Sequence, residues 1–169
     1  MSKIGIIVAS SNNNQKLAET LKKIALEQNC EAEIINLVNF NLPLYSTTEE
    51  EQNGIPESAL DLASKIMDLK AFIIVAPEYN GVMPPVLNNA MAWTSRATKN
   101  WREAFNDKIV ALATHSGRGG QKGLQAMRIL FQHLGANILA REILTTYEKP
   151  LKEDTAKLII ASLIKLSRD

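Results

Sequence analysis

Short apolar runs along the chain alternate with segments whose apolar residues recur at helical spacing. Five runs predict β-strands, at residues 4–9, 33–37, 71–76, 108–114 and 138–144. The run at 4–9 is continuous and apolar, as expected for a parallel strand covered on both faces. Charged residues flank the run at 33–37, which fits the edge of a sheet better than its centre.

The segments between these runs each carry one apolar stripe. They predict helices around residues 17–25, 56–66, 85–96, 127–134 and 154–168. Pro56 and Pro85 suit a first helical turn, where a missing amide hydrogen costs no internal bond. Gly135 is the expected C-cap of the fourth helix. Residues 40–45 are expected to be extended, and the acidic run at 49–51 is expected to be a solvated loop.

The order of these elements indicates an α/β fold. Parallel neighbours need crossover connections, so strands that alternate with helices favour a parallel sheet between two helical layers. Five such units suit a three-layer flavodoxin-like fold with strand order 2-1-3-4-5. In that order, the ends of the first and third strands flank a switch point where ligands of open sheets bind.

Composition narrows the class of protein. We expect residues 1–169 to form a single domain, because a chain of this size buries roughly 70% of its unfolded surface without disulfides or structural metal. The one cysteine, Cys30, has polar neighbours and is expected to be an inert thiol. The formal net charge is +1, with basic and acidic residues interspersed, so the chain offers no basic face to nucleic acid.

The apolar run nearest Met1, residues 4–9, is shorter than the core of a signal peptide or a membrane span. We therefore expect a cytoplasmic protein with no membrane partner.

Three loops follow predicted strands and carry the candidate chemistry. The first consists of hydroxyl and amide residues only, namely Ser10, Ser11, Asn12, Asn13, Asn14 and Gln15. Ahead of a helix, such donors can ring a phosphate while the helix dipole favours its negative charge. The same residue types are also ordinary in N-caps and turns, so both interpretations stay open. The loop lacks the glycine patterns that bind dinucleotides and nucleoside triphosphates, which argues against those ligands.

The second loop is Pro77, Glu78, Tyr79, Asn80 and Gly81, at the end of the predicted central strand. It combines a fixed φ, an aromatic ring, an amide and a glycine that lets a ligand approach the backbone. Its main-chain amides could grip a flat heteroaromatic ring. A plain turn between strand and helix is the alternative, but the position at the strand end favours a binding role.

The third loop spans residues 116–123 and contains four glycines. Ordering glycine is entropically costly, so such a run fits either a close approach of a ligand or an exposed hinge. Arg118 would bring a cation to this loop.

Other candidate chemistry is weaker. His115 and His133 lack the clustered carboxylates or thiolates of a metal site, and no Gly-x-Ser-x-Gly elbow is present. We expect His115 to be a hydrogen-bonded residue at a strand end and His133 to be structural. Trp93 and Trp101 are expected to be core or subunit-contact aromatics.

Taken together, these segments resemble the NADPH-dependent FMN reductase family of flavodoxin-like proteins, which includes quinone, chromate and azo-dye reductases. The resemblance runs through residues 3–10, 42–45, 77–81, 85–90 and 116–117. The second loop extended into its helix is the specific part, and the other segments are weak singly.

The resemblance implies FMN as cofactor and NADPH or NADH as co-substrate. It implies that the FMN phosphate contacts Ser10, Ser11, Asn12, Asn14 and Gln15. The isoalloxazine and ribityl chain would contact Pro77, Glu78, Tyr79, Asn80 and Gly81, and the ring would be bordered by Ser116, Gly117 and Arg118. Hydride would pass from the nicotinamide to flavin N5 and then to a quinone, free flavin or other small acceptor, with no conventional catalytic residue. Family members commonly form homodimers or homotetramers.

One departure from the family pattern concerns the first loop. Family members usually carry an Arg there, whereas this chain has a shorter loop with no Arg before Lys16. The phosphate would lose a bidentate cation, whose bonds are roughly twice as strong as neutral ones. Weaker FMN binding and compensation by Lys16 both remain open. An electron-carrier flavodoxin and a non-enzymatic regulatory module are therefore kept as alternatives, although carriers are typically strongly acidic.

Overall fold

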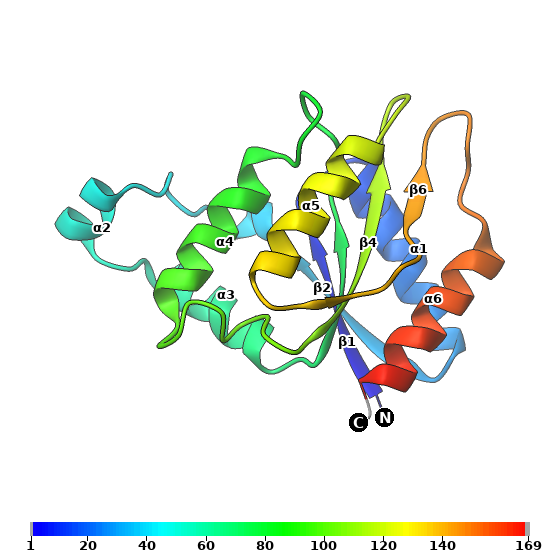
Figure 1. The fold of residues 1–169 in the computed structure, drawn as a ribbon, viewed down its shortest axis with the longest axis horizontal. Helices are drawn as coiled ribbons and strands as arrows, with labels where there is room; N and C mark the ends of the chain where they lie inside the picture. Colours follow the sequence, from blue (N-terminus) through cyan, green and yellow to red (C-terminus); the bar gives the residue numbers. More distant parts are fainter. Residues whose placement is uncertain (1, 168–169) are drawn as a thin grey trace.

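The computed structural model describes residues 2–167 and has a parallel sheet at its centre (Figure 1). Its strands are β1 (Ser2–Val8), β2 (Cys30–Asn36), β3 (Ala71–Val75), β4 (Ile109–His115), β5 (Asn137–Ile138) and β6 (Ile143–Thr145). The order is β2-β1-β3-β4-β5, with β6 also paired to β4, and every pairing is parallel. The predicted flavodoxin-like order 2-1-3-4-5 is confirmed.

The predicted fifth strand at 138–144 is wrong in one respect, because two short strands replace it. Val110 pairs with Ile138 and Ala113 with Ile143. The four residues 139–142 between β5 and β6 therefore lie opposite only two residues of β4, 111 and 112. The extra residues form a bulge in which Glu142 turns aside to pair with Arg128, at 2.6 Å.

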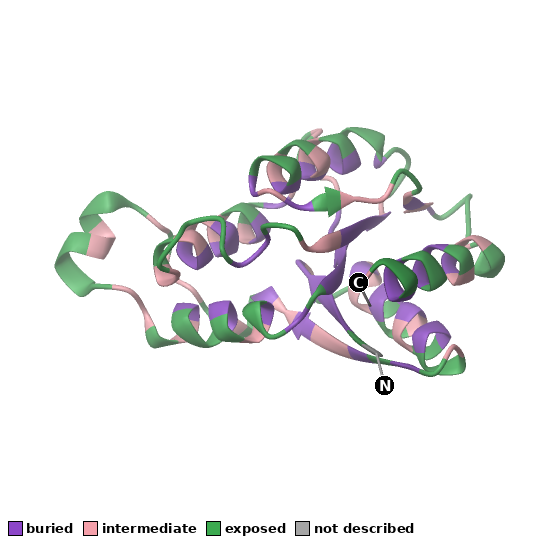
Figure 2. Cartoon of the chain, turned by 60° about the horizontal axis from the view of Figure 1, so that its bottom comes forward, coloured by how far each residue is buried: buried purple, intermediate pink, exposed green. Residues whose placement is uncertain are grey.

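Helices cover both faces of the sheet (Figure 2). One face carries α1 (Asn13–Glu27) and α6 (Glu153–Leu166). The other carries α3 (Glu57–Met67), α4 (Pro85–Ala97) and α5 (Gln121–His133). Alternate strand residues serve the two layers: Ile73 and Val75 of β3 pack under α1 and α6, whereas Phe72 and Ile74 pack under the other three helices. The predicted end of the last helix near residue 168 lies outside the described residues.

The acidic run at 49–51 is not a loop, contrary to the sequence-based expectation. It lies in a short helix, α2 (Thr47–Asn53), preceded by a 3-10 turn, η1 (Leu37–Phe40). The Ser46 hydroxyl accepts a hydrogen bond from the main-chain N–H of Glu49 at 3.0 Å, which caps the first turn. Glu50 then pairs with Arg96 of α4 at 2.9 Å. No residue of α2 is buried, so the expectation of a solvated surface was correct, and the helix projects from the body of the molecule (Figure 1).

Within residues 2–167, every helix is too short or too polar to cross a bilayer.

Candidate functional site

The three loops of interest leave the same edge of the sheet, where β1, β3 and β4 end (Figure 1). Parallel strands bring their carboxyl ends together, so segments far apart in the sequence meet there. The structure therefore gathers the predicted site residues at one edge.

The first loop leaves the start of α1 open. Asn12 occupies the N-cap position but makes no side-chain cap bond, and Ser11 and Asn12 are exposed. The Ser10 hydroxyl accepts a bond from the N–H of Asn12 at 3.3 Å. The uncapped first turn can offer main-chain donors to an anion, which suits a phosphate.

Two of the residues predicted to hold phosphate already have partners in the protein. Asn14 is buried, and its amide accepts from the His115 N–H at 2.8 Å and donates to the His115 carbonyl at 2.9 Å. Gln15 accepts from Asn36 at 2.8 Å and donates to Glu19 at 3.2 Å. These bonds fix α1 against β4 and β2, and direct contact of either side chain with a phosphate stays a prediction.

The second loop contains a tight hairpin turn. Tyr79 and Val82 exchange main-chain hydrogen bonds at 2.9 and 3.0 Å around Asn80 and Gly81. Both central residues have positive φ, 53° and 78°, the conformation of a type I′ turn, for which Asn-Gly is the preferred sequence. Half of the Tyr79 side chain, 51%, is exposed. The turn explains the Asn-Gly pair and presents an aromatic ring at the sheet edge.

Glu78 joins the second loop to the start of α5. Its carboxylate accepts from the Gly123 N–H at 2.8 Å, where it caps the first turn of that helix. A side chain at position 123 would meet Glu78 atoms at 3.0–3.3 Å, so the loop and the helix pack at a glycine. Gly123 was predicted to belong to the third loop, and its contact with Glu78 was not foreseen, because the two residues lie 45 positions apart in the sequence.

The third loop is exposed at Gly117, Arg118 and Gly119 and ends at Gly120, which has a φ of 110°. The predicted end at residue 123 is wrong, because α5 already begins at Gln121. Arg118 has no ion-pair partner within the described part of the chain. The cation is therefore available to a ligand at this edge.

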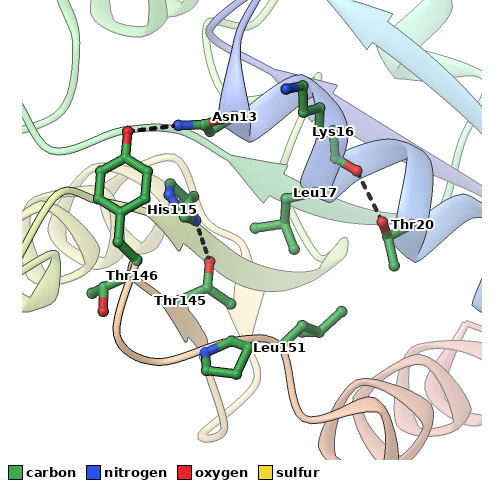
Figure 3. Close-up of a pocket in the computed structure, with 10 residues that line it drawn as sticks. Asn13, Lys16, Leu17, Thr20, His115, Thr145, Thr146 and Leu151 are labelled. Atoms are coloured by element: carbon green, nitrogen blue, oxygen red, sulfur yellow. Dashed lines mark hydrogen bonds between the residues drawn. The ribbon is translucent and has the colours of Figure 1, made fainter.

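His115 is hydrogen-bonded at the end of β4, as expected. Its Nδ1 lies 3.1 Å from the Thr145 hydroxyl (Figure 3). His133 stacks on Trp101, with ring centroids 5.2 Å apart. Trp93 is fully buried and donates to the Pro43 carbonyl at 2.7 Å, which confirms it as a core aromatic.

Residues 2–167 hold no group of three or more His, Cys, Asp or Glu side chains that could bind a metal ion.

Comparison with known proteins shows the family of the chain. The model of the NADPH-dependent FMN reductase family matches residues 2–148. An uncharacterized protein of Mycoplasma pneumoniae is 30% identical over 91% of this chain and 96% of its own length. A quinone reductase of Escherichia coli is 36% identical, but over only 49% of this chain and 43% of that enzyme.

The solved structures that superpose on the chain share its fold. The flavoenzyme NAD(P)H:(acceptor) oxidoreductase FerB of Paracoccus denitrificans matches with a TM-score of 0.75, at 22% identity over 99% of this chain and 96% of that one. A flavodoxin from an archaeon matches with a TM-score of 0.67, at 12% identity over 99% of each chain. Given the family match over most of its length, the chain belongs to the NADPH-dependent FMN reductase family.

Proposed function

We propose that the protein is an FMN-dependent NAD(P)H oxidoreductase that reduces a quinone, free flavin or another small acceptor. The observation that carries this proposal is the convergence of three ligand-ready loops at one sheet edge. The uncapped start of α1, the exposed Tyr79 turn and Arg118, which has no ion-pair partner within residues 2–167, lie at this edge. Membership in the family supports FMN as the ligand.

The residues present fit a flavin mononucleotide. The open amides of α1 and the hydroxyls of Ser10 and Ser11 would hold the phosphate. The turn at Tyr79 and the loop at Arg118 would hold the ring system from two sides. When bound, FMN supplies a hydride acceptor for NAD(P)H and an electron donor for the second substrate, so the two substrates can use one place in turn.

The chain's own contribution is to position and to stabilise charge. Arg118 and the loop amides would stabilise negative charge on the ring by donating hydrogen bonds to it. We assign no catalytic residue.

Two steps test the proposal. Apo-protein is titrated with FMN, and quenching of flavin fluorescence with saturation at micromolar FMN is expected. NADPH oxidation is then followed with a quinone, and turnover that depends on FMN is expected. FMN binding without NADPH oxidation would instead support an electron carrier. The absence of quenching at high micromolar FMN would support a non-enzymatic module.

We also propose a homodimer or homotetramer. Of the two tryptophans, Trp93 is fully buried and Trp101 is 43% exposed, so Trp101 is the one that could contribute to a subunit contact. Light scattering of the purified protein tests this, and a monomer at micromolar concentration would contradict it.

A further inference from the structure

A hollow of about 360 Å³ lies between α1 and the segment that joins β6 to α6 (Figure 3). None of the residues predicted to hold FMN is among those that line it. The hollow is on the α1 and α6 face of the sheet, because His115 shares that side of β4 with Ala111 and Ala113. The hollow therefore adjoins the first loop, through Asn13 and the neighbouring Lys16, and is separate from the second and third loops.

The hydrogen bonds of Thr145 indicate which ring nitrogen carries the hydrogen in neutral His115, which lines this hollow. The Thr145 hydroxyl donates its one proton to the Thr114 carbonyl at 3.1 Å. It then accepts from His115, so Nδ1 carries the hydrogen and, in the neutral ring, Nε2 carries a lone pair. Nε2 is shielded from solvent and has no hydrogen-bond partner within residues 2–167. A ligand that donates a hydrogen bond would satisfy this acceptor.

Tyr147 shields the imidazole and is only lightly held. Its ring lies nearly perpendicular to that of His115, at 5.2 Å. The Tyr147 hydroxyl accepts from the Asn13 amide at 3.1 Å, and the side chain is otherwise 75% exposed. Turning Tyr147 outward costs one exposed hydrogen bond and little buried area, and it opens the space beside the His115 ring.

The rest of the hollow combines one cation with apolar walls. Lys16 is the only Lys, Arg, Asp or Glu that lines it, and it makes no ion pair within the described residues. Leu17, Pro150 and Leu151 supply apolar surface. Such a lining favours a flat apolar body that carries one negative charge.

We propose that this hollow binds a small aromatic carboxylate that bears a ring hydroxyl. The carboxylate pairs with Lys16, the ring packs between Leu17 and Leu151, and the hydroxyl donates to Nε2 of His115. The carboxylate, the ring and the hydroxyl of the ligand thus each contact a different part of the hollow.

Four probes separate these contributions in the purified protein: 3- and 4-hydroxybenzoate, benzoate and phenol. Each is titrated to about 10 mM, above a Kd on the order of 1 mM for a single-ring ligand. Binding is followed by the imidazole NMR signals of His115, and His133 serves as the internal control. We expect His115 alone to shift with the better hydroxybenzoate isomer, and benzoate and phenol to bind about tenfold more weakly, since each lacks one polar contact.

Two variants complete the cycle. Lys16→Met is expected to weaken hydroxybenzoate and benzoate about fivefold and to leave phenol unchanged. Its matched control is Lys23→Met, an exposed lysine of α1 outside the hollow, which should change nothing. His115→Phe is expected to weaken hydroxybenzoate and phenol and to leave benzoate unchanged. Binding by these variants is followed through the backbone amides of residues 145–147.

Three results would overturn the proposal: no His115 shift with either hydroxybenzoate, equal affinity for hydroxybenzoate and benzoate, or equal effects of the Lys16 and Lys23 substitutions. Strict competition with FMN would also overturn it, because the hollow would then belong to the cofactor site. Failure of the apo-protein to bind FMN leaves these results unaffected, so the two proposals are tested separately.

Discussion

The carboxylate of Glu78 and the main-chain N–H of Gly123 are joined by a 2.8 Å hydrogen bond that ties the loop after β3 to the first turn of α5. Glu78 is half-buried and lacks an ion-pair partner within residues 2–167, so the helix start is the positive group that it meets. The bond fixes the Tyr79 turn relative to the third loop.

Replacing Glu78 tests this bond. Glu78→Ala is expected to lower the free energy of unfolding by about 2 kcal/mol and to weaken FMN binding, because the Tyr79 turn loses its anchor. Glu78→Gln keeps an acceptor oxygen and should cost about half as much. Urea denaturation and flavin titration measure the two effects. Equal stability of all three proteins would show that the bond contributes nothing.

Gly123→Ala tests the packing of the same contact. The added Cβ would meet Cβ, Cα and Cγ of Glu78 at 3.0–3.3 Å. Because Cα belongs to the main chain, the loop itself has to shift. We expect a loss of about 1–2 kcal/mol of stability, despite the better helix propensity of alanine. Gly117→Ala is the matched control, since a Cβ there has open space and φ is not positive. A stabilised Gly123→Ala protein would contradict the packing argument.

The Asn80-Gly81 turn gives a prediction about the cofactor. Gly81→Val forces a β-branched residue to a φ of 78°, and is expected to cost about 2 kcal/mol and to weaken FMN binding more than tenfold. Gly54→Val imposes at least as much strain, at a φ of 73° and a ψ of −168°, at the end of α2 and away from the three loops. Its FMN affinity should match that of the unmodified protein. If both variants lose flavin equally, the effect is general instability and the Tyr79 turn has no special role.

Asn14 is predicted to be a structural tie. Asn14→Leu leaves the N–H and the carbonyl of His115 without their partner, so we expect a loss of about 2 kcal/mol in urea denaturation. Asn12→Ala, an exposed neighbour, should stay within about 0.5 kcal/mol of the unmodified protein. Similar values for both substitutions would contradict the role of the bridge.

Lys108 should make stability depend on pH. Burial lowers the pKa of this lysine from 10.5 to about 8, and Nζ donates to the carbonyls of Ile66 and Met67. Between pH 8 and 10.5 the unfolded chain binds more protons, so stability should rise with pH in that window. The side chain is only half-buried, so solvent screening limits the rise to about 1 kcal/mol.

The measurement for Lys108 is the difference in unfolding free energy between the unmodified protein and Lys108→Met at pH 7.5 and 10, since other groups titrate in both proteins. The difference should move in favour of the unmodified protein as pH rises. A constant difference would mean that Lys108 keeps an ordinary pKa.

The sheet and its large helices could be predicted from the sequence, because the apolar stripe of each helix packs on the apolar residues of the strands. The errors have a local and a long-range cause. The Ser46 cap of the helix at 47–53 is a local signal that was overlooked. The pairs of Glu50 with Arg96 and of Glu142 with Arg128 join residues that lie far apart in the sequence. Periodicity carries no trace of such contacts.

The candidate site was predictable to the level of loops but not of individual contacts. The Tyr79 loop was found because it follows a buried strand. The internal bonds of Asn14 and Glu78 were not, since each depends on a partner that folding brings to the site. The same is true of Nε2 of His115, whose lone pair follows from the Thr145 hydroxyl 30 residues away.

The pair of hydrogen bonds between the Asn14 side chain and the main chain of His115 has a thermodynamic consequence. It fastens the first turn of α1, where an anion would dock, to one of the residues that line the hollow between α1 and the segment after β6. If a ligand bound at one site moves that turn, it changes the affinity of the other site for its own ligand. Thermodynamic linkage then requires each ligand to change the affinity of the other by the same factor. Asn14 is thus the residue through which two chemically unlike ligands would sense one another.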